Sequence, residues 1–296
     1  MRLERQLKIA LDESRLLILG SQVLFGFQFN GIFQQKFAGL AFPSRVFVCA
    51  GLPLLIVALA LLIAPSMQHR IVERGQDSRR VLALATLCAG WALLPVAVAL
   101  ELDMFVAMQQ VASSSVAAVA AGLFFALAML CWYVVAWVSQ AKERPVQEPA
   151  KPTPLDTQVE QLLTEARVII PGVQALLGFQ LTVTLTQAFA ELATHAKIAH
   201  AVALCCIAVA VILLMAPASV HRIAFSGQDD PDFVRIGSFF VIAAPGFLAF
   251  GIALDAYVAG GRALQSEPAA IALAAVSVLL LFGFWYVFPL WRRMKG

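Results

Sequence analysis

Apolar residues in this chain are gathered into long stretches that contain no Asp, Glu, Lys or Arg. Eight such stretches are present, over residues 16–35, 46–68, 81–100, 104–141, 168–190, 198–220, 236–254 and 268–291. A helix needs about 20 apolar residues to cross the hydrocarbon core of a bilayer, so each stretch is long enough to cross it once. The fourth stretch exceeds one span, and its polar start, MFVAMQQVASSS, predicts an extramembrane loop or an interfacial stretch before a helix over about 116–138. The pattern predicts an all-α membrane protein with eight transmembrane helices.

The composition supports this class, and the basic residues set its orientation. Of 296 residues, 61% are hydrophobic and 13% are charged, whereas soluble proteins average roughly 45–50% apolar and about 25% charged residues. Eight spans place both termini on one side, and if that side is the cytoplasm, 17 of the 21 Lys and Arg residues are cytoplasmic. The positive-inside rule therefore predicts a multi-pass protein with both termini inside. Since topology accounts for the net charge of +3, we expect the lipid bilayer as partner and no nucleic acid.

The second half of the chain repeats the first at an offset of 152 residues. One aligned pair is LDESRLLILGSQVLFGFQ, from Leu11, and LTEARVIIPGVQALLGFQ, from Leu163. Shared hydrophobicity does not explain the matched polar residues, which include Glu13/Glu165, Arg15/Arg167, Gln22/Gln174, Gln28/Gln180, His69/His221, Arg70/Arg222 and Asp103/Asp255. The chain is therefore an internal duplication, and because a four-span unit returns to its starting side, the two four-helix repeats are parallel. We expect the repeats over 1–140 and 155–296, joined by a Pro-rich cytoplasmic linker over 141–154.

Amide and hydroxyl side chains along the first and fifth predicted helices form the first candidate site. They are Gln22, Gln28, Asn30, Gln174, Gln180 and Thr182. Polar groups in hydrocarbon need hydrogen-bond partners or a wet path. One hypothesis is a channel or transporter in which they line a route for a small solute or monovalent ion. The alternative is a non-catalytic accessory or structural protein that packs with another membrane complex, with these groups bonded across helix contacts. A lipid or quinone-like ligand is a third hypothesis.

Charged residues at the cytoplasmic ends of the first, second, fifth and sixth helices form the second candidate site. They are Glu13, Arg15, His69, Arg70, Glu165, Arg167, His221 and Arg222. The topology places them at one depth, where we expect Glu13 to pair with Arg70 and Glu165 with Arg222. Such pairs would fasten neighbouring helices at the membrane interface. A gate that responds to protonation of the two histidines is the other hypothesis.

No catalytic motif is visible, and the sequence predicts neither an enzyme nor a bound cofactor or metal ion. His195 and His200 are five residues apart, which is poor spacing for one helix face. The five cysteines lie within apolar stretches without a CxxC pair, which favours packing roles. Asp103 and Asp255 fall at the predicted outer ends of helices, where we expect solvated carboxylates. Oligomeric state and protein partners are left open.

The second half, through EARVIIPGVQALLGFQLTV and APASVHRIAF, resembles an uncharacterised bacterial family of four-span membrane proteins. The first half is similar through ESRLLILGSQVLFGFQ and APSMQHRI. The resemblance implies a four-helix unit present twice in the cytoplasmic membrane of a bacterium, and implies no tested activity. Some members of that family are automatically labelled sodium:proton antiporter. The sequence gives that label little support, because Na⁺/H⁺ exchange needs carboxylates near the midplane and the predicted spans contain none.

Overall fold

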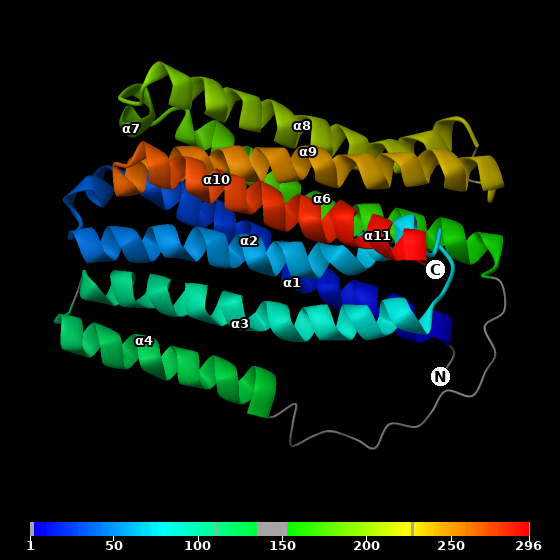
Figure 1. The fold of residues 1–296 in the computed structure, drawn as a ribbon, viewed down its shortest axis with the longest axis horizontal. Coiled ribbons are helices and arrows are strands. Elements are labelled where there is room, and N and C mark those ends of the chain that lie inside the picture. Colours follow the sequence, from blue (N-terminus) through cyan, green and yellow to red (C-terminus); the bar gives the residue numbers. More distant parts are fainter. Residues whose placement is uncertain (1–2, 111, 135–152, 226–227, 296) are drawn as a thin grey trace.

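The computed structural model describes residues 3–110, 112–134, 153–225 and 228–295, and these residues are helical apart from short connections (Figure 1). The helices of the first half are α1 (Leu3–Ile32), η1 (Gln35–Gly39), α2 (Phe42–Ile71), α3 (Arg79–Gln109), α4 (Ser114–Met129) and η2 (Leu130–Val134). Those of the second half are α6 (Leu155–Val183), α7 (Gln187–Ala190), α8 (Thr194–Ile223), α9 (Pro231–Leu264), α10 (Glu267–Phe282), η3 (Gly283–Val287) and α11 (Phe288–Lys295). The predicted linker over 141–154 lies almost wholly outside the described residues.

Seven helices of the described part are long and apolar enough to cross a membrane, which confirms the all-α membrane class. α1 is not among these seven, because Gln22, Gln28 and Asn30 lower the hydropathy of its apolar part. The predicted loop over 104–115 is wrong in its first half, because α3 continues to Gln109. The connection to α4 is correspondingly short.

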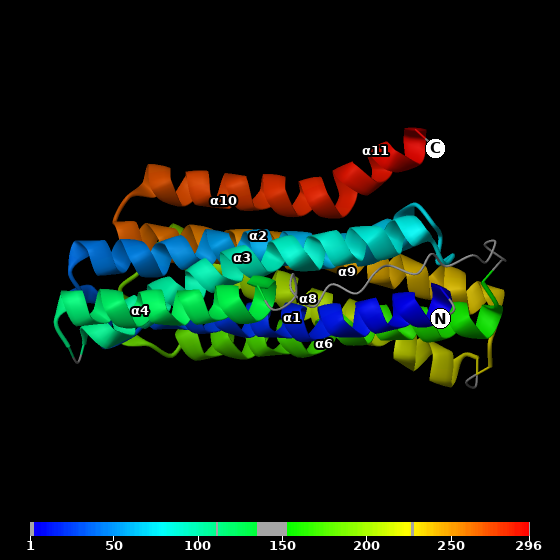
Figure 2. The same ribbon diagram turned by 90° about the horizontal axis from the view of Figure 1, so that it is seen from below.

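The long helices lie nearly side by side, and α1 and α6 both begin at the end of the molecule where the termini lie (Figure 1). Between the halves, α1 packs against α6, and α2 packs against α9 and α10. Seen from below, α10 lies on one side of the layer that holds α2 and α9, and α6 lies on the other (Figure 2). α2 is consequently the most enclosed of the spans, with 61% of its apolar window buried.

Equivalent helices of the two halves begin at equivalent capping residues. The side chain of Ser78 accepts a hydrogen bond from the backbone of Arg80 at the start of α3, and Asp230 does the same for Asp232 in α9. Ser113 caps α4 and Ser266 caps α10 in the same way. Because such caps satisfy backbone N–H groups that the helix leaves unpaired, they fix where each helix starts.

A Trp-Tyr pair occupies a π-helical turn in each half, but only one tryptophan reaches the other half. Tyr133 donates to the carbonyl oxygen of Gly90 and Tyr286 to that of Ile242, both at 2.6 Å. Trp285 is fully buried, and its Nε1 donates to the carbonyl oxygen of Ala60 in α2 at 3.1 Å. Trp132 is half-buried. The π turn of η3 therefore joins the second half to α2.

The halves contact each other through different faces, so the interface is heterologous. A Cβ atom on Gly26 would collide with the ring of Phe179, and one on Gly172 would collide with the side chain of Gln22. The residues equivalent to these glycines, Gly178 and Gly20, have nothing within 4 Å of such an atom. Close approach of helices at glycine is common in membrane bundles, and here each half uses a different glycine for it.

Replacing Gly172 by leucine is expected to lower the stability of the folded protein by about 1–3 kcal/mol, because the new side chain overlaps Gln22 at the α1–α6 contact. The control is Gly31→Leu, at an open position of α1, for which we expect no loss. Thermal unfolding of both variants in the same detergent measures the difference. Equal melting temperatures would contradict this account of the interface.

Candidate functional site

A buried ion cluster joins the two halves near the end of α2. Glu165 of α6 has none of its surface exposed, and one of its carboxylate oxygens lies 2.5 Å from Nδ1 of His69. The other oxygen accepts a hydrogen bond from Nε of Arg70. The Nη1 group of Arg70 faces the hydroxyl of Ser238 in α9 at 3.4 Å. A buried carboxylate is tolerated when it is paired and hydrogen-bonded in this way.

The loop after α2 holds the start of α6 beside this cluster. Gly75 has a φ of +79°, and its backbone N–H donates to the carbonyl oxygen of His69 at 3.1 Å, which turns the chain. Beyond the turn, Asp77 accepts a hydrogen bond from Gln161 of α6 at 2.7 Å. Gln76 accepts one from the backbone of Thr153 at 2.8 Å. The first half thus fixes where the second half begins.

The predicted rim of charged residues forms with a different pairing. We expected Glu13 to pair with Arg70, but the partner of Arg70 is Glu165 of the second half. Glu13 is exposed instead. The physical reason is that α6 of the other half packs against α1, which brings the side chain of Glu165 to the end of α2.

The remaining rim residues are not gathered at this cluster. Arg15 is half-buried and Arg167 is exposed. His221 is half-buried, with its ring centroid 4.6 Å from that of Phe233. The side chain of Arg222 lies outside the described residues. Glu165, which was predicted to pair with Arg222, pairs with Arg70.

A second buried polar cluster lies toward the opposite end of the second half. Gln180 donates from Nε2 to Oδ2 of Asp255 at 2.7 Å, and Nδ1 of His200 lies 3.6 Å from Oδ1 of the same carboxylate. Nε2 of His200 lies 3.1 Å from the carbonyl oxygen of Gln180. The rings of Phe29 and Phe189 flank His200 at 5.7 and 5.2 Å. All three polar residues are at most 1% exposed.

The expected solvated carboxylate at Asp255 is therefore wrong. α9 continues to Leu264, which places Asp255 well inside the helix. The repeat carried a signal for the contact of Gln180 with Asp255, because the equivalent residues of the first half are also a glutamine and an aspartate. There, Gln28 donates to Asp103 at 2.8 Å. His200 was missed, and no repeat signal marks it, since Val48 occupies its position in the first half.

The predicted pathway residues divide into a buried and an exposed set. Gln22 is fully buried against Gly172, and neither of its amide atoms has a hydrogen-bond partner in the described part of the chain. Gln28 and Gln180 are buried in the contacts given above. Asn30 is half-buried and accepts from Gln34 at 2.6 Å. Gln174 and Thr182 are exposed, so a symmetric seam between α1 and α6 does not form.

Three buried polar positions instead follow one face of α6. Glu165, Gly172 with Gln22 against it, and Gln180 are spaced by seven and eight residues, which is two helical turns each time. At 1.5 Å of rise per residue, neighbouring positions are about 10–12 Å apart along the helix. We call this row the α6 polar line.

Several buried atoms of the α6 polar line have no hydrogen-bond partner among the described residues. They are Oε1 and Nε2 of Gln22, Nε2 of His69, Nη2 of Arg70, Oε1 of Gln180, Nδ1 of His200 and Oδ1 of Asp255. Buried polar atoms in proteins are nearly always satisfied, so these atoms are an exception; two of them, Nδ1 of His200 and Oδ1 of Asp255, face each other at 3.6 Å. In the described part of the chain, no group of three His, Cys, Asp or Glu side chains is placed to hold a metal ion.

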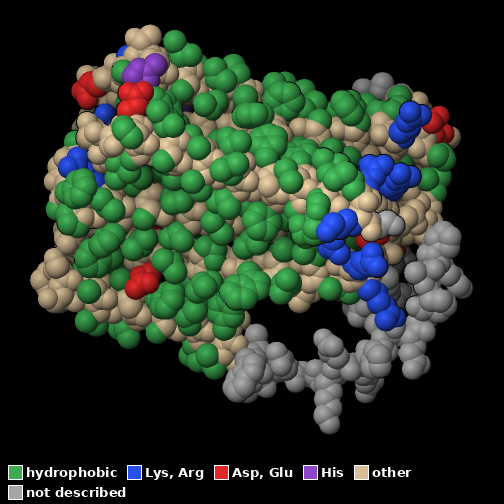
Figure 3. Space-filling model, viewed as in Figure 1, with side chains coloured by type: hydrophobic (Ala, Val, Ile, Leu, Met, Phe, Trp, Pro, Cys, Tyr) green, Lys and Arg blue, Asp and Glu red, His purple; other side chains and the backbone are tan. Residues whose placement is uncertain are grey.

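A polar hollow opens to the surface one helical turn beyond the second cluster. Its volume is about 380 Å³, and its lining includes Glu191, His195, Tyr257, Arg262 and Glu267. Ala196 and Val258 also line it, and they are one turn from His200 on α8 and Asp255 on α9. Figure 3 shows histidine and acidic side chains together at this end, while Lys and Arg gather at the end that carries the C-terminus. The hollow thus lies close to the second cluster, although Gln180, His200 and Asp255 are not part of its lining.

Replacing Glu165 by alanine is expected to destabilise the protein by about 3–5 kcal/mol, because it leaves the Arg70 charge buried without its carboxylate. The control is Arg167→Ala at an exposed position of the same helix, which we expect to stay within about 0.5 kcal/mol of the parent protein. Denaturant unfolding of both variants in detergent checks this. Equal losses for the two would show that the cross-half pair contributes nothing.

No curated protein and no solved structure matches the chain. The model of a family of unknown function, DUF6328, matches twice, over residues 1–136 and 150–289. Two successive matches to one family are what a tandem duplication of its domain produces. Because the matches cover most of the sequence, the chain belongs to the DUF6328 family and carries that domain in each half.

Proposed function

We propose that this protein conducts protons or a small monovalent cation across a membrane along the α6 polar line. In this proposal all eight long helices span the bilayer, α1 included, as two parallel four-helix repeats. Both termini lie in the cytoplasm, and the clustering of Lys and Arg at the terminal end supports that orientation (Figure 3). The two buried clusters then lie near opposite faces of the membrane, and Gln22 lies between them.

The observation that carries the proposal is the presence of two buried carboxylates along α6, Glu165 on the helix itself and Asp255 of α9 bonded to Gln180. Glu165 and Asp255 are each at most 1% exposed, and each has a histidine beside it. Ionisable groups inside a membrane are costly, and they are characteristic of ion pathways and proton relays. Arg70 neutralises the charge of Glu165, so the carboxylate of Asp255 is the group that favours a cation or a proton over an anion.

The spacing of the line requires water between its polar positions. Steps of about 10–12 Å exceed the reach of a direct hydrogen bond, which spans about 3 Å between heavy atoms. The unpaired amide of Gln22 offers both a donor and an acceptor at the midpoint, as a bridging water needs. Its burial between α1 and α6, with Gly172 against it, supports a narrow route and disfavours a larger solute.

An accessory role in a larger membrane complex is the second proposal, because Gln174 presents an amide on the exposed face of α6. An amide that faces hydrocarbon is stabilised by a hydrogen bond to another helix. In that case the buried clusters serve only to hold the two halves together. Ion flux separates the two proposals.

Purified protein in liposomes is expected to pass H⁺, or one of Na⁺ and K⁺, above the level of empty liposomes under an imposed voltage or gradient. Asp255→Asn keeps the shape of the side chain and removes its charge, so we expect flux to fall to the level of empty liposomes. The matched control is Asp103→Asn, which changes the equivalent half-buried carboxylate of the first half and leaves the α6 polar line intact. We expect its flux to equal that of the parent protein.

Correct folding of each reconstituted variant is checked by its melting temperature before flux is measured. Silence of the folded parent protein for all three cations would reject conduction and favour the accessory role. Equal flux of Asp255→Asn and the parent protein would reject the α6 polar line as the route.

A further inference from the structure

The heterologous contact between the halves leaves two faces of the molecule without the partner that their equivalents have. In the contact itself, α1 and α2 of the first half pack against α6, α9 and α10 of the second. The helices of the second half that are equivalent to α1 and α2 are α6 and α8. The helices of the first half that are equivalent to α6, α9 and α10 are α1, α3 and α4. We call these the second-half outer face and the first-half outer face.

Burial of equivalent residues shows that the second-half outer face is uncovered. Ala60 and Ile63 of α2 are at most 1% exposed, whereas their equivalents in α8, Ile212 and Met215, are 66% and 50% exposed. Gln22 and Gly26 of α1 are buried, whereas Gln174 and Gly178 of α6 are exposed. This face therefore presents the apolar residues and the Gln-Gly pair that α1 and α2 use to hold the second half.

The first-half outer face is uncovered in the same sense. Leu16 is 71% exposed, and its equivalent in α6, Val168, is 2% exposed. Gly20 has nothing within 4 Å of an added Cβ atom, while its equivalent Gly172 receives the side chain of Gln22. Leu16 and Gly20 of α1 are thus equivalent to residues of α6 that pack against the other half, but they are themselves uncovered.

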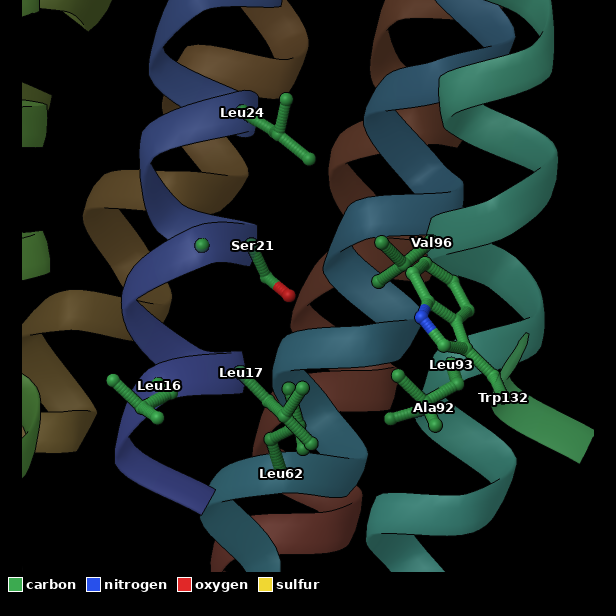
Figure 4. A pocket seen from close by; sticks show the side chains of 10 residues that line it. Leu16, Leu17, Ser21, Leu24, Leu62, Ala92, Leu93, Val96 and Trp132 are labelled. Atoms are coloured by element: carbon green, nitrogen blue, oxygen red, sulfur yellow. The ribbon is translucent and has the colours of Figure 1, made fainter. Parts of the chain in front are cut away.

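An apolar cavity lies at the centre of the first-half outer face (Figure 4). Its volume is about 290 Å³, and its lining includes Leu16, Gly20, Ser21, Leu62, Ala92 and Trp132. The equivalent region of the second half is filled by the first half, because Gln22 packs on Gly172 and Ala60 accepts the hydrogen bond of Trp285. The cavity therefore lies where a copy of α1 and α2 would insert.

Charged groups match across the two outer faces. Glu13, equivalent to the fully buried Glu165, is exposed on the first-half outer face. His221, equivalent to His69, is half-buried on the second-half outer face, and its Nε2 atom has no hydrogen-bond partner among the described residues. A Glu13 carboxylate placed against His221 would repeat the contact that Glu165 makes with His69.

From this correspondence we propose that a second copy of this chain docks head to tail in the membrane, with its first-half outer face on the second-half outer face of its neighbour. The contact repeats the one between the halves of a single chain: Gln174 of one copy packs on Gly20 of the next, and His221 faces Glu13. Because α1 and α6 run in the same direction, the docked copies share one orientation in the bilayer (Figure 1). Such a heterologous contact forms a ring if its rotation closes, and otherwise an open row.

Disulfide cross-linking tests the register of the proposed contact. In a full-length protein whose five cysteines are replaced by alanine, cysteines are introduced at Gly20 and Gln174 (G20C and Q174C), and membranes are oxidised. We expect a covalent dimer and higher multimers. The matched control carries L87C and F239C, which are equivalent positions of the two halves. Leu87 is 58% exposed and Phe239 is 66% exposed, so neither position takes part in the contact between the halves. We expect this control to stay monomeric. The proposal is overturned if G20C and Q174C cross-link no more strongly than the control pair.

The mass of the protein in nanodiscs provides an independent test. We expect the parent protein to contain at least two chains per particle, and Gly20→Trp and Gly178→Trp, each at an open position, to reduce it to one chain. Leu87→Trp is the control and keeps the parent mass. A monomeric parent protein, or multimers that survive both glycine variants, would overturn head-to-tail docking. Ion flux has no part in these readouts, so conduction and self-association succeed or fail separately.

Discussion

The buried carboxylate of Glu165 is the constraint on which the arrangement of the two halves depends. A charge without exposure to water needs a partner, and the partners of Glu165 are His69 and Arg70 of the other half. Although each half contains a glutamate and a His-Arg pair, the acid of this cluster comes from the second half and the bases come from the first. The same contact ties α6 to the end of α2, and Trp285 bonded to Ala60 joins η3 to that helix, which also packs against α9. Burial of one carboxylate is therefore coupled to burial of the central span.

A duplicated sequence has produced two halves with unequal surroundings. A symmetric pair would bury Gln22 and Gln174 equally, but a heterologous contact buries one and exposes the other. The physical cause is that each repeat has two faces for packing, and within one chain only one face of each is used. Polar groups that are alike in sequence thus have different environments. Asp255 is buried beside His200, while Asp103 is half-buried beside Gln28 alone.

This inequality concentrates polar chemistry on one side of the molecule. The α6 polar line has a carboxylate and a histidine in the buried cluster at each of its ends, and the second of these clusters lies one helical turn from the polar hollow lined by His195 and Glu267. The equivalent row on α1 contains the exposed Glu13 and the open Gly20. Conduction, as proposed, uses the face that the contact buries, whereas self-association, as proposed, uses the faces that it leaves open.

The sequence by itself determined the class of the protein, the place of the apolar helices and the likeness of the two halves. Those properties follow from local composition and from matched residues, which need no knowledge of packing. It also singled out Glu165, His69 and Arg70, but assigned Glu13 as the partner of Arg70. Only the tertiary structure decided that pairing, the burial of Asp255 beside His200 and the opposite exposure of Gln22 and Gln174. The reason is that equivalent residues of a duplication are equally suited to a contact, and the packing of whole helices selects which one makes it.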